Sequence, residues 1–222
     1  MILFDSAGES CKLDPILREM RGMNVAGSII FHAGELDSSS LSLCDGGFPC
    51  LILSPYSLQS SYNIKFIIFD IEKRMDMAIG YLRKQDISDI WIIIPMRYHS
   101  LFNSTIKSDG NRVHLLFSSD IINTFNLCIM NGVGDKGGGV IAATAEIAIG
   151  ISSYRNKIKS NFPIISLENS SLIGGFYPSI VSIAPSGYQY GAFLGRYLVS
   201  EIEKKENKPL LPQLRIVESS IV

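Results

Sequence analysis

The sequence lacks the excess of basic residues that marks many nucleic-acid-binding proteins. Its 222 residues include 20 Lys and Arg against 21 Asp and Glu, which gives a net charge of −1. Because binding to a phosphate backbone needs clustered cations, this balance gives no sign of nucleic acid as a direct partner. With 46% hydrophobic and 18% charged residues, the composition is that of a globular protein with a full core.

Long hydrophobic runs are absent as well. The longest, such as residues 90–95 (IWIIIP), are far shorter than the roughly 20 residues that a membrane helix needs. The N-terminal stretch MILFDSAGE has neither a positive region nor a long apolar stretch, so it does not resemble a signal peptide. We therefore expect a cytoplasmic protein with no membrane contact.

Motifs of common enzymes and metal sites are also missing. The four cysteines form no CxxC pair and have no histidine at a ligand spacing, so we expect free thiols and no metal. The three histidines are scattered, and there is no GxSxG. Gly132, Gly134 and Gly137 spell GxGxxG, but the segment leads into a strand instead of opening a helix, which indicates a turn. We predict neither an enzyme nor a cofactor.

What the sequence does have is an alternation of short apolar runs and amphipathic stretches. This pattern predicts an α/β fold with parallel sheets covered by helices. Strands are expected at residues 1–4, 27–31, 49–54, 66–70, 90–94, 113–117, 139–144 and 163–167. Helices are expected at residues 13–23, 72–85, 146–159 and 188–205, and residues 210–222 are expected to return as an extended segment.

Two acidic residues close predicted strands. Asp70 and Glu168 each follow an apolar run, and ligand-contacting groups gather at strand ends in open α/β sheets. Carboxylates there suit the binding of hydroxyl groups. Capping of a helix in the following loop is the alternative.

Several segments in order resemble the effector-binding domain of LacI/GalR-family transcription regulators, which shares its fold with periplasmic sugar-binding proteins. FPCLILS is similar to the family's iPvVlid, FIIFDIEKRMDMAIGYL to V..Dn..g...A..hL, and GGVIAATAEIAIGI to tAvfc.nD..AlGa. FPIISLENSS resembles isvvgfDd, and LRIVESS resembles l.vReSs. The similarity runs nearly from end to end.

The resemblance implies two Rossmann-like lobes with parallel sheets, joined by crossover strands. One would comprise residues 1–87 and 184–208, and the other residues 88–183 and 209–222. A small-molecule effector in the cleft between the lobes would change their closure and, through a homodimer, control DNA binding. A stand-alone solute-binding protein and a degenerate interaction module without ligand are the alternatives.

The sequence also departs from the family. Members begin with a further strand and helix, preceded by a DNA-reading helix-turn-helix, and neither occurs before MILFDSAGE. We therefore expect a fragment or a reduced domain, with DNA contact only through a helix-turn-helix absent from this chain. An unpaired sheet edge would favour self-association.

The ligand pocket implied by the resemblance is altered. The family's Asn-Asp corresponds to Thr144 and Ala145, so one hydroxyl-binding carboxylate is lost and Ala145 is expected to contribute only packing. Simple sugars should bind weakly, and a ligand with an amine or amide should suit the remaining acids better. The expected ligand contacts are Asp70, Arg97, Asn103, Thr144 and Glu168.

Overall fold

The computed structural model divides the chain into two compact units, which are described separately. The first unit comprises Met1–Phe69 and Tyr188–Pro212, and the second Asp70–Gly187 and Gln213–Val222. The structure describes residues 13–31, 48–54, 64–68, 71–99, 112–134, 137–173, 175, 179–184, 187–207, 209–211 and 215–218. None of the helices in these residues is long and apolar enough to cross a membrane.

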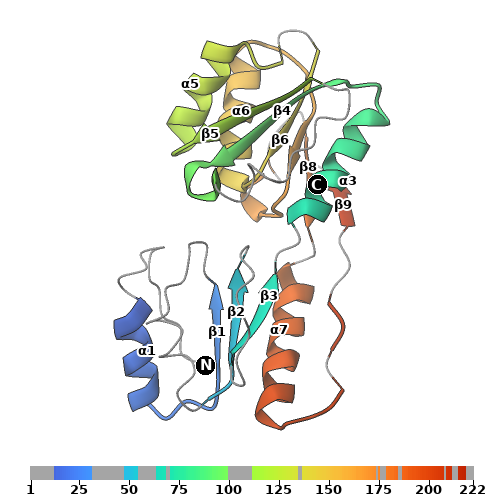
Figure 1. Ribbon diagram of the computed structural model, residues 1–222. Helices are drawn as coiled ribbons and strands as arrows, with labels where there is room; N and C mark the ends of the chain where they lie inside the picture. Colours follow the sequence, from blue (N-terminus) through green and yellow to red (C-terminus); the bar gives the residue numbers. More distant parts are fainter. Residues whose placement is uncertain are drawn as a thin grey trace. The chain divides into compact units, whose positions relative to one another are not determined.

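A three-stranded parallel sheet forms the centre of the first unit (Figure 1). Its strands lie in the order β1 (Ser28–Phe31), β2 (Cys50–Ser54) and β3 (Ile64–Ile68). Helix α1 (Leu13–Gly22) packs on one face and helix α7 (Gly187–Ile202) on the other.

The period of two along β2 explains this layering. Cys50 and Ile52 pack in the cluster that contains Leu17 of α1, whereas Leu51 and Leu53 pack in the cluster that contains Phe193 of α7. Successive side chains of a strand point to opposite faces, so a run of apolar residues supplies a core on both sides.

A six-stranded sheet forms the centre of the second unit, in the order β5-β4-β6-β7-β8-β9. Strands β4 to β8 pair in parallel, and β9 pairs antiparallel with β8. The C-terminal segment therefore returns as a strand of the second unit, as predicted. The strand bounds are β4 (Asp89–Pro95), β5 (Arg112–Ser118), β6 (Gly139–Ala142), β7 (Ile164–Ser166), β8 (Ile180–Ala184) and β9 (Arg215–Glu218).

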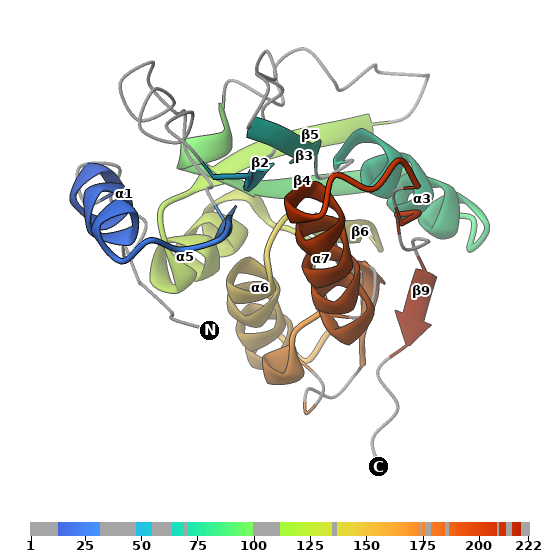
Figure 2. The same cartoon turned by 90° about the horizontal axis from the view of Figure 1, so that it is seen from below.

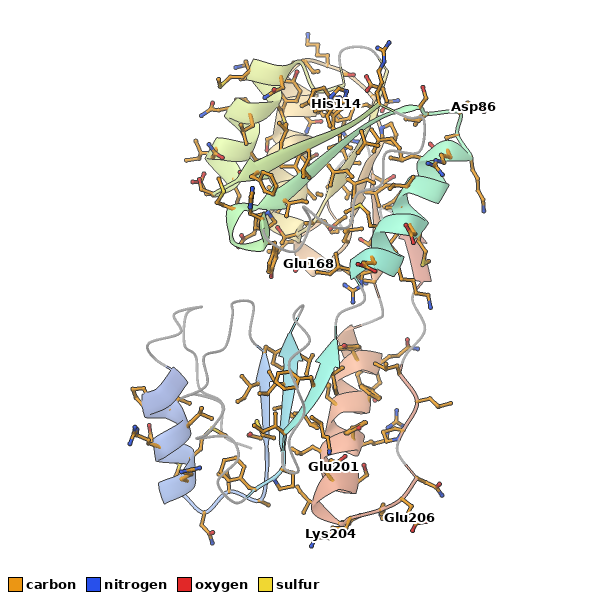
Figure 3. The ribbon with its side chains drawn as sticks, viewed as in Figure 1. Asp86, His114, Glu168, Glu201, Lys204 and Glu206 are labelled. Atoms are coloured by element: carbon orange, nitrogen blue, oxygen red, sulfur yellow. The ribbon has the colours of Figure 1, made fainter. Side chains whose placement is uncertain are left out.

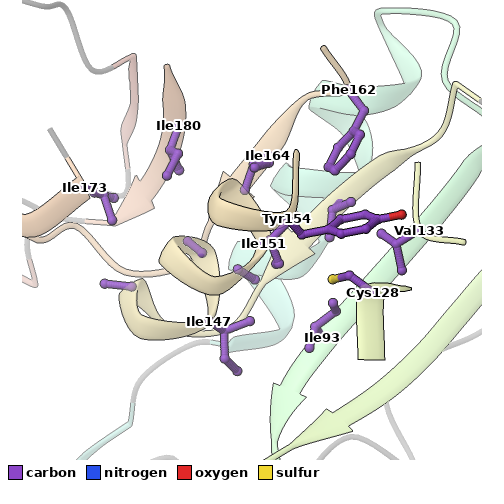
Figure 4. Close-up of a cluster of buried hydrophobic side chains, with 14 residues drawn as sticks. Ile93, Cys128, Val133, Ile147, Ile151, Tyr154, Phe162, Ile164, Ile173 and Ile180 are labelled. Atoms are coloured by element: carbon purple, nitrogen blue, oxygen red, sulfur yellow. The ribbon is translucent and has the colours of Figure 1, made fainter. Parts of the chain in front are cut away.

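Helices cover both faces of this sheet (Figures 1 and 2). Helices α5 (Ile121–Asn131) and α6 (Ala145–Lys157) pack on one face, where the buried cluster drawn in Figure 4 joins them to the strands. Helix α3 (Ile71–Arg83) packs on the other face. The short 3-10 helix η2 (Met96–Tyr98) follows β4, and the short 3-10 helix η3 (Ser171–Ile173) follows β7.

Helix α3 lies in the second compact unit. The first unit ends at Phe69 before it resumes at Tyr188, whereas the sequence analysis expects a first lobe of residues 1–87 and 184–208. The apolar α3 residues Met75, Ala78 and Leu82 are buried against Ile90 and Ile92 of β4 and against neighbouring strands. A helix belongs to the unit whose sheet buries its apolar stripe. The periodicity of the helix shows that such a stripe exists, but not which sheet it packs against.

Most predicted elements within the described residues are present. β3 begins two residues earlier than expected, at Ile64, and β6 ends at Ala142. The helix α5 and the strand β8 were not predicted. The strand expected at residues 1–4 lies outside the described residues.

Candidate ligand-binding site

The strand order of the second unit changes direction next to β4. From β4 the chain passes to β5 on one side and then to β6 on the other side. In open parallel sheets, ligands bind beyond the carboxyl ends of the strands at such a switch point. Beyond β4 lies η2, and beyond β6 lies Thr144. The topology alone therefore places a candidate site at this edge of the sheet.

Thr144 marks the start of α6. Its backbone is extended, with φ −129° and ψ 162°, and its Oγ1 accepts a hydrogen bond from the N–H of Ile147 at 3.4 Å. The side chain is buried. A hydroxyl in this position satisfies one of the N–H groups that a helix leaves free in its first turn.

Glu168 supplies a carboxylate to the same turn. It follows β7, which pairs with β6, and its Oε2 accepts a hydrogen bond from the N–H of Ala145 at 3.0 Å. The positive end of the α6 dipole favours a negative charge there. Figure 3 shows Glu168 at the edge of the second unit near the start of α3. The backbone N–H of Ala145 is therefore bonded to Glu168, and the contribution of Ala145 to a ligand stays a prediction.

The turn that carries Glu168 is itself bonded on both sides. Ser166 Oγ donates to the carbonyl oxygen of Glu168 at 2.8 Å and accepts from the N–H of Glu168 at 3.2 Å. The N–H of Leu167 donates to the carbonyl oxygen of Ala142 in β6 at 2.9 Å. These bonds fix the backbone from which the carboxylate projects.

Arg74, in the first half of α3, completes this arrangement and was missed by the sequence analysis. Its Nη1 donates to the carbonyl oxygen of Leu167 at 2.9 Å, and its side chain is buried. A signal for it did exist, because Arg74 lies between Ile71 and Ala78 at the helical spacing of the apolar stripe. A cation on that stripe predicts a buried acceptor opposite it.

The five predicted ligand contacts are only partly described by the structure. Thr144 and Glu168 both accept hydrogen bonds from the first turn of α6, Thr144 from the N–H of Ile147 and Glu168 from the N–H of Ala145. The backbone of Arg97 lies in η2, next to the carboxyl end of β4, and its side chain lies outside the described part of the chain. Asp70 and Asn103 also lie outside it. Their roles as ligand contacts stay predictions.

The glycine motif has the structural role expected of a turn. Gly132 ends α5 in the left-handed conformation, with φ 61°, and Gly139 begins β6. Gly134 has φ +78°, and a Cβ built there would lie 2.2 Å from Cδ1 of Phe162. The loop follows a helix and precedes a strand, which is the reverse of the order in a dinucleotide-binding loop.

Other chemistries find little support in the described residues. They contain no group of three or more His, Cys, Asp and Glu side chains that could hold a metal ion. Cys128 is free and buried, and burial raises the pKa of its thiol to about 12. A thiol that stays protonated is a poor nucleophile.

Comparison with known proteins identifies the fold. No family model and no curated protein matches the sequence. Among solved structures, transcription regulator CcpA of Lactococcus lactis is 20% identical with a TM-score of 0.74, over 99% of this chain and 87% of that one. A LacI family transcriptional regulator from Bifidobacterium animalis subsp. lactis is 14% identical with a TM-score of 0.78, over 96% and 83%.

A third similar structure contains a ligand. It is a LacI family transcriptional regulator from Enterococcus faecium with bound ribose, 17% identical with a TM-score of 0.73, over 99% of this chain and 86% of that chain. Because the sequence identities are low and the TM-scores are high, these structural similarities establish the fold alone. The chain therefore has the α/β fold of these regulators, as the resemblance in the sequence predicted.

Proposed function

We propose that this chain is the effector-sensing and dimerisation domain of a LacI/GalR-type transcription regulator, without enzymatic activity. The observation that carries the proposal is the placement of Thr144 and Glu168. Both lie around the start of α6, at the switch-point edge of a sheet whose fold is shared with ribose-bound regulators. DNA would be contacted by a helix-turn-helix outside this chain, and the protein would act in the cytoplasm.

The ligand class follows from the groups at this edge. Glu168 offers a carboxylate, and Thr144 offers a hydroxyl that already accepts one backbone hydrogen bond. An ionised carboxylate accepts hydrogen bonds and donates none. We therefore propose an effector that carries an amine or an amide, held in addition by Asp70, Arg97 and Asn103. Simple neutral sugars are expected to bind weakly.

A thermal-shift panel tests the ligand proposal. The probes are D-ribose, D-glucose, D-galactose, D-glucosamine and adenosine, since a ligand at a hundred times its Kd adds about 2.7 kcal/mol of stability. We expect D-glucosamine to raise Tm more than D-glucose, and Glu168→Gln or Asp70→Ala to remove the rise. Glu206→Gln, at an exposed site in the first unit, is the control and should leave it intact.

Two other results would change the assignment. A large shift by ribose, glucose or galactose that Asp70→Ala abolishes would show that the change at Ala145 leaves sugar binding intact. No shift by any probe would favour a degenerate interaction module. The bond between Glu168 and Ala145 favours that second function, because the protein's own carboxylate then occupies the helix N-terminus.

Dimerisation is tested separately. We expect light scattering to give the mass of two chains, against 24.5 kDa for one. A monomer at tens of micromolar or more would contradict the dimerisation part of the proposal without touching the ligand part.

A further inference from the structure

We propose that Arg74 is a positioning residue, which holds Glu168 in place at the start of α6 by fixing the peptide group that precedes it. The importance of this role for ligand binding rests on the proposed function. The positioning itself rests on contacts within the second unit.

The peptide groups next to Leu167 are anchored in two directions. The Leu167 N–H is bonded to Ala142 of β6, which continues the pairing of β6 and β7 beyond the last strand residue. The Leu167 carbonyl oxygen, which belongs to the peptide group shared with Glu168, accepts from Nη1 of Arg74 at 2.9 Å. With one bond to the sheet and one to α3, this short segment cannot rotate without breaking a buried hydrogen bond.

The contact with Arg74 is a strong one for its kind. A guanidinium donor is charged and planar, so its hydrogen bonds are stronger and more directional than those of neutral donors. Leu167 is also buried, at 3% exposure, in the same cluster as Met75 and Ala78 of α3. Packing and hydrogen bonding therefore hold this segment against the same helix.

The direction of the Glu168 side chain depends on that segment. Its carboxylate reaches Ala145 only when the backbone at residues 167 and 168 has the described orientation. Without Arg74, the peptide group between Leu167 and Glu168 keeps only the longer bond from the Glu168 N–H to Ser166 Oγ, at 3.2 Å, so we expect it to reorient and to shift the carboxylate with it. α3 is also the first helix of the second unit, which begins at Asp70. The hydrogen bond of Arg74 therefore connects the first helix of this unit to the candidate site.

The experiment uses the Ala145 amide as a reporter in ¹⁵N–¹H correlation spectra of the full chain without ligand. Glu168→Ala defines where the Ala145 resonance lies when the carboxylate is gone. We expect Arg74→Met to move the resonance in the same direction by a comparable amount. Arg83→Met, at an exposed arginine of the same helix, is the matched control and should leave it in place.

A second variant guards against loss of folding. Arg74→Gln keeps an N–H donor on a shorter side chain, and we expect a smaller displacement of the Ala145 resonance. An unmoved Ala145 resonance in whichever variant folds overturns the proposal. If neither folds, Arg74 serves the stability of the unit and the positioning role is likewise rejected.

This outcome is distinguishable from failure of the proposed function. If the Ala145 resonance responds as expected but no probe raises Tm, Arg74 positions Glu168 in a domain that senses none of those ligands. If probes raise Tm but the resonance does not respond, ligand binding holds and the role of Arg74 is rejected.

Discussion

The carboxylate of Glu168 caps the helix that begins at Ala145. Its Oε2 lies 3.0 Å from the backbone nitrogen of Ala145, although the two residues are 23 positions apart in the sequence. The LacI/GalR resemblance expects an acidic side chain at position 145 itself. In this chain the negative charge at the turn comes instead from the neighbouring strand, beyond the end of β7.

Removal of this cap should weaken the second unit. We expect Glu168→Ala to lower the free energy of unfolding by about 1 kcal/mol, because a helix N–H loses a charged acceptor, and Glu168→Gln to lower it less. Urea unfolding followed by the fluorescence of Trp91 measures this, since the single tryptophan of the chain lies on β4 of the second unit.

The control for this measurement is Glu146→Gln. Glu146 lies in the first turn of the same helix and is exposed, so it feels the same helix dipole. An equal loss in both variants would mean that the dipole, and not the hydrogen bond to Ala145, accounts for the effect.

Thr144 should contribute a smaller amount at the same place. Its hydrogen bond to Ile147 is long, at 3.4 Å, so Thr144→Ala is expected at the lower end of the range of about 0.5–2 kcal/mol for N-cap residues. Thr144→Ser keeps the hydroxyl and should retain most of the stability in the same urea experiment. A Ser variant as unstable as the Ala variant would show that the methyl group, which is buried, matters more than the cap.

The sequence predicted the sheets well because buried parallel strands consist of short runs of apolar residues. It did not predict α5, because exposed Ile122 and Met130 blur the helical periodicity of that segment. Strand β8 was missed because Ser182 interrupts an otherwise apolar run. The contact of Glu168 with Ala145 could not be predicted, since it depends on which strands become neighbours and on the orientation of a single turn.

The candidate site likewise has residues that the sequence could predict and a contact that it could not. Residues at strand ends, such as Thr144 and Glu168, could be named from the alternation of strands and helices. The position of Arg74 on the apolar stripe of α3 indicates a buried acceptor, but that acceptor could not be identified, because it is a backbone carbonyl and a carbonyl carries no signal in the sequence. The partner of Arg74 was set by the packing of α3 on the six-stranded sheet.

Two helical glycines should respond in opposite ways to the same substitution. A Cβ at Gly150 would lie 2.9 Å from the carbonyl oxygen of Ile121 and 3.0 Å from Cβ of Thr124, so Gly150→Ala must push α5 away from α6. We expect a loss of about 1–3 kcal/mol. At Gly80 of α3 nothing lies within 4 Å of such a Cβ, and Gly80→Ala should add about 0.5–1 kcal/mol.

Both variants are measured by urea unfolding with Trp91 as the probe, because both helices belong to the second unit. A gain of stability for Gly150→Ala would show that the two helices can separate at little cost. The contrast between the two sites removes the effect of helix propensity, which is the same for both.

Arg155 should make the stability of the second unit depend on alkaline pH. Arg155 is 1% exposed, and burial lowers the pKa of its guanidinium to about 10, below its value in the unfolded chain. Between the folded and the unfolded pKa the unfolded chain binds more protons than the folded one, so the free energy of unfolding should rise with pH above 10. Below pH 10 the guanidinium is charged in both states and this contribution is constant.

Two substitutions at Arg155 separate the charge from the volume. Arg155→Met fills a similar space and removes the cost of a buried charge, but it also removes the donor that binds the Phe162 carbonyl at 3.2 Å. Because these two effects oppose each other, we expect the stability of Arg155→Met at neutral pH to lie near that of the unsubstituted chain. Arg155→Ala leaves a cavity besides and should be less stable than Arg155→Met by about 2 kcal/mol or more. The difference between Arg155→Met and the unsubstituted chain, followed below and above pH 10, cancels the titration of all other groups. If that difference does not change with pH, the Arg155 guanidinium keeps its ordinary pKa in the folded protein, and its burial carries no measurable cost.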